Sequence, residues 1–134
     1  MNRIKVAAGI ILRQLPNQKQ QVLIAKRPHD KHQGGLWEFP GGKVEPKETS
    51  EQALSRELLE EINISVLKSE FFQQIDFDYF DKKVSLSFYS ISEFSGEPKG
   101  LEGQETQWVF VDDLERYDFP PANQEVVAKL QEKS

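Results

Sequence analysis

Residues 41–64 read GGKVEPKETSEQALSRELLEEINI, and they are the most informative part of the chain. It predicts a glycine turn followed by an amphipathic helix. Thr49 and Gln52 have the spacing of a capping box, in which each side chain bonds the other's free backbone N–H, so we expect the helix to begin near Thr49. The apolar stripe that should face the core consists of Leu54, Leu58 and Ile62, widened by Leu59.

Three glutamates of the same helix, Glu57, Glu60 and Glu61, fall within one narrow arc at about 100° per residue. Like charges at these spacings repel each other and destabilise a helix. A divalent cation would offset the repulsion, and clustered carboxylate oxygens suit Mg²⁺ or Mn²⁺. We expect the small Ala53 on this face, where it leaves room for a ligand. The alternative is a solvated acidic face, which is the usual meaning of an acidic run on its own.

The fixed positions of the stretch resemble the Nudix box of the Nudix hydrolase superfamily. That pattern is Gly, five residues, Glu, seven residues, Arg-Glu, an aliphatic residue, any residue, Glu-Glu, any residue, Gly and an aliphatic residue. The matching positions are Gly42, Glu48, Arg56, Glu57, Leu58, Glu60, Glu61 and Ile64. Asn63 stands where the pattern has Gly. Because Asn is the next best residue for positive φ at a helix end, we expect this departure to cost little.

Segments outside the box resemble the MutT branch of the superfamily, whose members hydrolyse oxidised guanine nucleotides. They are residues 9–11 (GII), 36–43 (LWEFPGGK) and 119–123 (FPPAN), so the resemblance covers nearly the whole chain. It implies the Nudix fold, an α/β/α sandwich around a mixed sheet. Pattern alone predicts strands over residues 3–12, 21–25, 37–39, 64–79, 83–94 and 108–111 and a final helix over 123–133, which supports only a mixed α and β protein.

Composition limits the possible functions. The 134 residues are expected to form a single Nudix hydrolase domain, and the absence of cysteine excludes disulfides and thiolate metal sites. No apolar run could span a bilayer and no signal segment is apparent, so we expect a cytoplasmic protein with no membrane partner. The net charge of −5 argues against stable binding to nucleic acid. We expect a monomer whose partner is a small, metal-chelated nucleotide.

The resemblance implies that water attacks the β-phosphorus of a nucleoside triphosphate, releasing the monophosphate and pyrophosphate. The expected Mg²⁺ ligands, with Mn²⁺ as a substitute, are the carboxylates of Glu57, Glu60 and Glu61 and a backbone carbonyl at Gly41. Glu102 matches a loop carboxylate of the family that can reach the metal, although a solvated loop acid is the alternative. Glu57 is the first choice for the general base, and Glu60 is the second.

Two basic residues near the box have open roles. Arg56 is expected to pair with Glu48, because a guanidinium matches a carboxylate through two parallel hydrogen bonds, and contact with phosphate is the alternative. Lys43 either contacts phosphate or is solvated.

Three residues are candidates for binding the base. Asn123 can offer both donors and an acceptor to a purine edge, and its alternative role is to cap the last helix. By family alignment Arg27 helps to hold the oxidised base, whereas alone it reads as a solvated loop cation. Phe39 is a candidate apolar wall of the pocket, or plain core. His29 and His32 are more typical of surface histidines than of a metal site.

Three functions are therefore compared. The favoured one is an 8-oxo-dGTP diphosphatase that cleanses the nucleotide pool and so prevents oxidative mutagenesis, a task in DNA replication and repair. The second is a Nudix pyrophosphohydrolase for a cytidine nucleotide, a dinucleoside polyphosphate or a nucleotide sugar. The third is a Nudix module that binds without catalysis, which is disfavoured because the chain keeps every carboxylate of the box.

Overall fold

The computed structural model describes residues 3–17, 19–27 and 35–133. His29 and His32 lie outside these residues. In the described part the elements follow in the order β1 (Ile4–Gln14), β2 (Gln20–Lys26), β3 (Trp37–Glu38), β4 (Gly41–Lys43), α1 (Ser50–Ile62), β5 (Ser65–Asp78), β6 (Lys83–Ser95), β7 (Thr106–Phe110), the 3₁₀ helix η1 (Val111–Arg116) and α2 (Pro121–Lys133). No helix among them is long and apolar enough to cross a membrane.

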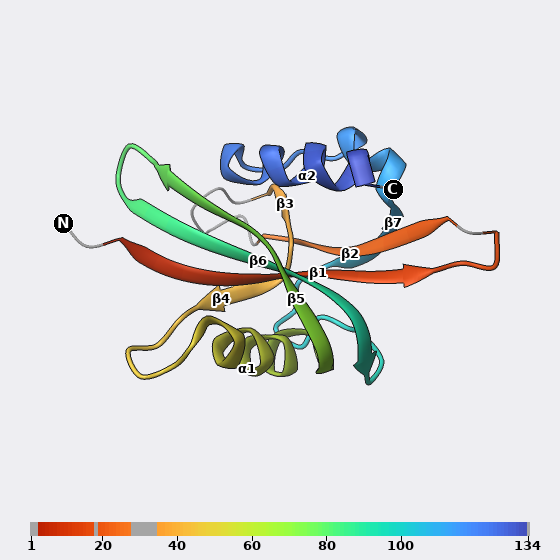
Figure 1. Cartoon of the computed structure of the whole chain (residues 1–134), viewed down its shortest axis with the longest axis horizontal. Helices are drawn as coiled ribbons and strands as arrows, with labels where there is room; N and C mark the ends of the chain where they lie inside the picture. Colours follow the sequence, from red (N-terminus) through yellow and green to blue (C-terminus); the bar gives the residue numbers. More distant parts are fainter. Residues whose placement is uncertain (1–2, 18, 28–34, 134) are drawn as a thin grey trace.

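The sheet is mixed, and β1 is its central strand. β1 pairs in parallel with β6 from Ile4 to Ile11, and β6 continues to the edge strand β5. The opposite side of β1 is shared between two antiparallel strands, β4 at Val6–Ala8 and β2 at Leu12–Gln14. β3 and β7 both pair with β2. The short strands β3 and β4 follow each other with only Phe39 and Pro40 between them, and they pass from β2 to β1 across this split (Figure 1).

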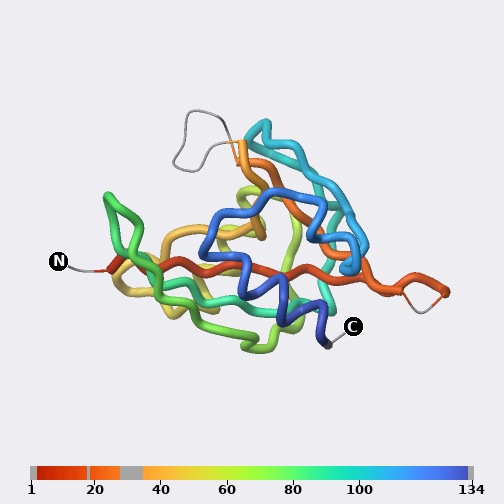
Figure 2. The backbone as a smooth tube through the Cα atoms, turned by 90° about the horizontal axis from the view of Figure 1, so that it is seen from above, coloured from red at the N-terminus to blue at the C-terminus, as the bar shows by residue number. Residues whose placement is uncertain are grey.

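Two helices cover opposite faces of this sheet, which confirms the predicted α/β/α sandwich. Figure 1 shows α2 above the sheet and α1 below it. Each helix closes its own cluster of buried side chains: Val126, Val127 and Leu130 of α2 lie in one, and the α1 residues lie in the other. Figure 2 shows the turn between β5 and β6 beside the start of β1, where Arg3 donates to the carbonyl oxygen of Val84.

The boundaries of α1 agree with its sequence. Thr49 is the N-cap, and its side chain and that of Gln52 form both bonds of the capping box. Leu54, Leu58 and Ile62 are fully buried. Asn63 ends the helix in the left-handed conformation with φ of 65°, as predicted for the residue that replaces Gly.

Two predictions about α1 are wrong. Leu59 does not widen the apolar stripe, because its side chain is 51% exposed. Ala53 leaves no room for a ligand, because it is fully buried in the core cluster that Val44 also contacts. The reason is β4, which the sequence placed in a turn. This strand and the residue after it pack over one flank of α1 and leave the opposite flank open to solvent.

Candidate active site

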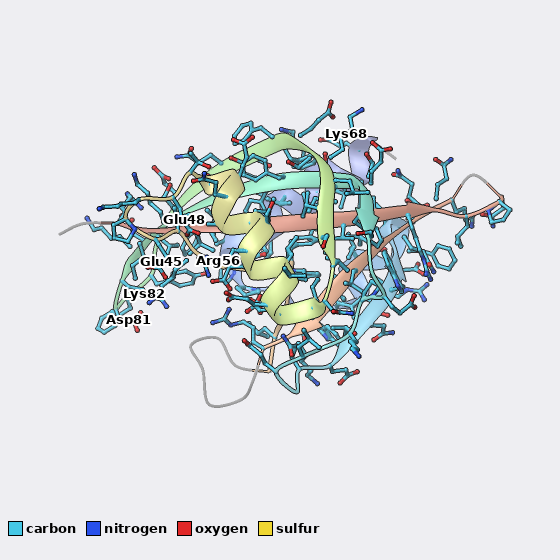
Figure 3. The ribbon with its side chains drawn as sticks, turned by 90° about the horizontal axis from the view of Figure 1, so that it is seen from below. Glu45, Glu48, Arg56, Lys68, Asp81 and Lys82 are labelled. Carbon is cyan, nitrogen blue, oxygen red and sulfur yellow. The ribbon has the colours of Figure 1, made fainter. Side chains whose placement is uncertain are left out.

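Arg56 bonds to the carboxylates of three glutamates of the Nudix-like stretch, which are Glu48, Glu57 and Glu60. Its Nε donates to Glu48 Oε2 at 2.7 Å and its Nη2 donates to Glu48 Oε1 at 2.9 Å, so the predicted pairing is confirmed. Its Nη1 donates to Glu57 Oε1 at 2.8 Å and reaches Glu60 Oε2 at 3.5 Å. Its Nη2 also donates to the carbonyl oxygen of Lys43 at 3.1 Å. Figure 3 shows Arg56 and Glu48 on the same flank of α1. Arg56 thus ties the loop before α1 and the end of β4 to the helix.

The main chain of β4 lies directly against the Glu57 carboxylate on one side and against β1 on the other. A Cβ at Gly42 would overlap that carboxylate, and a Cβ at Gly41 would overlap the carbonyl oxygen of Ala7 on β1. The predicted glycine turn is therefore a strand, paired with β1, whose two glycines allow α1 and β1 to approach closely.

Glu61 carries the strongest electrostatic signal of the site. Burial, followed by the negative charges of Glu57, Glu38 and Glu102, raises the pKa of the Glu61 carboxyl to about 8, while a backbone hydrogen bond from Gly41 acts in the opposite direction. The Glu61 carboxyl is therefore largely withdrawn from solvent and has three other carboxylates near it.

A polar cavity of about 310 Å³ lies between Glu61 and the loop that carries Glu102. Its lining residues are Lys26, Arg27, Glu38, Gly41, Glu61, Glu102 and Gln104. We call it the acidic cavity. It brings together three glutamates from three separate parts of the chain. Two basic residues face them from the end of β2.

The donor chemistry of this region fits a divalent cation. Carboxylate oxygens from α1 and the 100–104 loop are hard ligands, and a cation among them would offset the repulsion that raises the pKa of Glu61. Among the described residues, no three acidic or histidine side chains are already drawn into one group that could hold an ion. The Glu57 carboxylate is instead bonded to Arg56.

A second cavity, of about 210 Å³, lies on the α2 side of the sheet. Its apolar walls come from β1, β6 and Phe39, and it is lined by Ile4, Val6, Ala8, Arg27, Glu38, Phe39, Gly41, Gly42, Lys43, Tyr79, Lys82, Val84, Leu86, Phe88, Pro120 and Asn123. We call it the apolar cavity. It is smaller than the roughly 300–1,000 Å³ typical of pockets that enclose a whole ligand. It therefore suits one planar part of a larger ligand. Arg27, Glu38 and Gly41 line both cavities.

Asn123 is not the cap of the last helix. It is the third residue of α2, which begins at Pro121, and its N–H donates to the carbonyl oxygen of Pro120 at 2.9 Å. Pro121 starts the helix instead, because proline suits a first helical position. Asn123 is 8% exposed and is the one polar residue that the described part of the chain buries. Asn123 borders the apolar cavity.

Arg27 and Glu38 form an ion pair where the two cavities meet. Arg27 Nη1 donates to Glu38 Oε1 at 2.6 Å. Burial raises the pKa of the Glu38 carboxyl in spite of the opposing effect of Arg27. Arg27 is therefore not the solvated loop cation of the alternative interpretation.

The other predicted residues are placed as follows. Phe39 is buried, stacks on Phe119 at 5.3 Å between ring centroids, and forms part of the wall of the apolar cavity. Lys43 is exposed at the rim of the same cavity. Glu102 is exposed at the acidic cavity.

Among the polar residues that line the cavities, the sequence did not single out Glu38, Tyr79, Lys82 and Gln104. An acidic residue between two aromatic ones, as in Trp37-Glu38-Phe39, was an available signal for the first. The other three come from turns whose position depends on the assembled sheet.

The fold and site together define a domain with an apolar cavity beside a cavity lined by carboxylates. The chain belongs to the NUDIX domain family, whose model matches residues 11–129. It is 39% identical to the 8-oxo-dGTP diphosphatase of Escherichia coli K12 over 130 residues, covering 97% of this chain and 98% of the relative. It is 35% identical to the CTP pyrophosphohydrolase of the same strain over 123 residues, covering 92% and 87%. A solved structure from work on MutT of Aliivibrio salmonicida and Vibrio cholerae matches with a TM-score of 0.86 and 45% identity, covering 99% of this chain and all of that one.

Proposed function

We propose that this protein hydrolyses 8-oxo-dGTP to 8-oxo-dGMP and pyrophosphate. The observation that carries the proposal is the place of Asn123, a largely buried polar residue that lines the apolar cavity. An amide at the wall of a mostly apolar cavity can bond to the polar edge of a ligand that enters it. The E. coli relative named 8-oxo-dGTP diphosphatase supports the same substrate.

The two cavities suggest how the nucleotide lies. The base enters the apolar cavity against Phe39, and Asn123 bonds to its edge. The sugar and phosphates pass Arg27 and Gly41, which line both cavities, and end at the acidic cavity. Lys43, at the rim of the apolar cavity, is placed to contact the phosphates.

Oxidation of guanine changes the hydrogen-bonding groups on the edge of the base that Asn123 would contact. It turns N7 from an acceptor into a donor, so a site that presents an acceptor there leaves normal guanine unpaired. Such a mismatch in a buried site can separate two substrates by several orders of magnitude. The amide oxygen of Asn123 can be that acceptor while its nitrogen donates to the neighbouring carbonyl of the base.

We propose that Glu57, Glu60, Glu61 and Glu102, with the carbonyl oxygen of Gly41, hold Mg²⁺, for which Mn²⁺ can substitute. The bound ion lowers the pKa of water and neutralises phosphate charge. In the overall step, the oxygen of water bonds to the β-phosphorus, and the bond breaks between that phosphorus and the oxygen that bridges it to the α-phosphorus. The bridging oxygen leaves with the monophosphate.

The remaining roles belong to side chains of the box. For removal of the proton from water we propose Glu57 first and Glu60 second, because the side chain of Glu57 is 17% exposed and that of Glu60 is 56% exposed. Arg56 orients Glu57 through the bond at 2.8 Å, and Glu48 holds Arg56 in turn. We further propose that residues 1–134 act as a single catalytic domain, as a monomer in the cytoplasm.

The test compares kcat/KM for 8-oxo-dGTP, dGTP and CTP in the presence of Mg²⁺, with monophosphate and pyrophosphate as the measured products. A large preference for 8-oxo-dGTP supports the proposal. CTP is included because one relative is a CTP pyrophosphohydrolase. A preference for CTP would transfer the assignment to a cytidine nucleotide and leave Asn123 without a role in selecting oxidised guanine.

A further inference from the structure

The loop between β6 and β7 is bonded to the C-terminal end of α1. The N–H of Lys99 donates to the carbonyl oxygen of Ile62 at 3.0 Å, and the N–H of Leu101 donates to that of Glu61 at 2.8 Å. The last carbonyls of a helix have no partner within the helix, so this loop supplies partners for two of them. Glu102 on the loop and Glu61 on the helix therefore belong to one hydrogen-bonded unit.

Gln104 joins the tip of this loop to the helix. Its Oε1 accepts from the N–H of Glu102 at 2.9 Å, and its Nε2 donates to the carbonyl oxygen of Glu61 at 3.4 Å. An amide can accept at one end and donate at the other, which neither a carboxylate nor a hydrocarbon side chain can do. Gly100 makes room for this arrangement, since a Cβ there would overlap the carbonyl oxygen of Gln104.

The tip itself is otherwise open. Glu102 is exposed, and Gly103 has φ of 82° with no atom within 4 Å of the position that its Cβ would take. The far end of the loop is anchored, because the N–H of Lys26 donates to the carbonyl oxygen of Glu105 at 2.9 Å. The Glu102–Gly103 tip thus lies between two anchored segments, and the Gln104 side chain bonds to its main chain.

We propose that Gln104 is a positioning residue, whose amide holds the main chain of Glu102 against the end of α1 so that the Glu102 carboxylate stays at the acidic cavity near Glu61. The inference rests on the proposed function, in which Glu102 acts at that cavity. Gln104 contacts neither substrate nor metal in this scheme and acts through Glu102.

Asn63 provides a matched comparison at the root of the same loop. Its Nδ2 donates to the carbonyl oxygen of Glu97 at 3.2 Å. Asn63 stands where the Nudix pattern has Gly, and a glycine has no side chain that could form this bond. Asn63→Gly removes a bond at the root, keeps a residue suited to the positive φ, and leaves the tip untouched.

The experiment compares Gln104→Ala with Asn63→Gly, and with Gln107→Ala as a control for losing an exposed glutamine of β7. The readouts are hydrogen exchange of the Glu102 amide, the dissociation constant for Mn²⁺ without nucleotide, and kcat and KM for 8-oxo-dGTP. For Gln104→Ala we expect faster exchange, and about tenfold losses in Mn²⁺ affinity and kcat with KM little changed. Asn63→Gly should lower Mn²⁺ affinity and kcat by less than threefold, and Gln107→Ala should match the wild type.

The double variant Glu102→Gln/Gln104→Ala decides whether Gln104 acts through Glu102. If it does, the double variant has the kcat of Glu102→Gln alone. If the kcat losses of the two single variants multiply in the double variant, the proposal is overturned. An unchanged Mn²⁺ affinity in Gln104→Ala would also overturn it. Failure of the wild type to hydrolyse 8-oxo-dGTP would instead refute the proposed substrate, while amide exchange and Mn²⁺ affinity would still decide the role of Gln104.

Discussion

Arg56 and Glu48 form a two-bonded ion pair, with N···O distances of 2.7 and 2.9 Å, that fastens the loop before α1 to the helix. Because the guanidinium of Arg56 also bonds to Glu57 at 2.8 Å, the orientation of a candidate metal ligand depends on a residue nine positions earlier in the chain.

The first prediction concerns acid stability. Hydrogen bonds from Arg56, and then from the N–H of Glu45, lower the pKa of Glu48 from 4.5 to about 2. A carboxyl whose pKa is lower in the folded protein stabilises the fold at pH values above its unfolded-state pKa. This contribution is lost as the pH falls toward the folded-state pKa. In urea titrations, Glu48→Gln should therefore be less stable than wild type at pH 6, and the difference should shrink between pH 4.5 and 2. The control is Glu51→Gln, and a difference that is constant with pH would contradict the prediction.

The second prediction concerns turnover. Glu57→Gln keeps an acceptor for Arg56 but removes the negative charge, so kcat for 8-oxo-dGTP should fall by at least about 100-fold. Circular dichroism and the Tm without metal should stay near those of wild type. Activity within a fewfold of wild type would remove Glu57 from the proposed metal site.

The third prediction concerns metal binding. A chelator should abolish hydrolysis, and added Mg²⁺ or Mn²⁺ should restore it. Because a ligand that binds only the folded state raises stability, Mn²⁺ should raise the Tm of the wild type. It should do so much less for Glu61→Gln, in which one carboxylate of the acidic cavity is neutral. Equal increases in the two proteins would place the ion elsewhere.

The fourth prediction concerns the base. Asn123→Ala should reduce kcat/KM for 8-oxo-dGTP by about 2 kcal/mol, or some 30-fold, because the buried edge of the base loses its partner. The loss for dGTP should be smaller. Gln124→Ala is the matched control, since Gln124 is the next residue of α2 and borders a different cavity. Equal losses for both nucleotides would make Asn123 a structural residue.

The fifth prediction tests the packing of α1. Ala53 is fully buried and Leu59 is 51% exposed. Ala53→Leu should lower the free energy of unfolding by about 1–3 kcal/mol through overpacking. Leu59→Ala should change it by no more than about 0.5 kcal/mol. Urea denaturation measures both, and the reverse order would show that the helix is rotated from the orientation described.

The features of α1 that depend on neighbours a few residues away could be predicted from the amino-acid sequence. The capping box of Thr49 and Gln52, the buried repeat of Leu54, Leu58 and Ile62, and the left-handed Asn63 all follow from helix geometry and from bonds within one or two turns. The pairing of Arg56 with Glu48 could be predicted because the partners are only eight residues apart and their charged groups have matching shapes.

The set of residues that meet at the two cavities depends on the assembled fold and could not be predicted from local patterns. Arg27 joins Glu38, and Gln104 reaches the end of α1, through the pairing of β2, β3 and β7 and the loop before β7. The burial of Ala53 depends on β4, and that of Asn123 depends on a helix that begins at Pro121. These contacts join parts of the chain that are far apart, so their geometry is set by the packing of the whole sheet and its two helices.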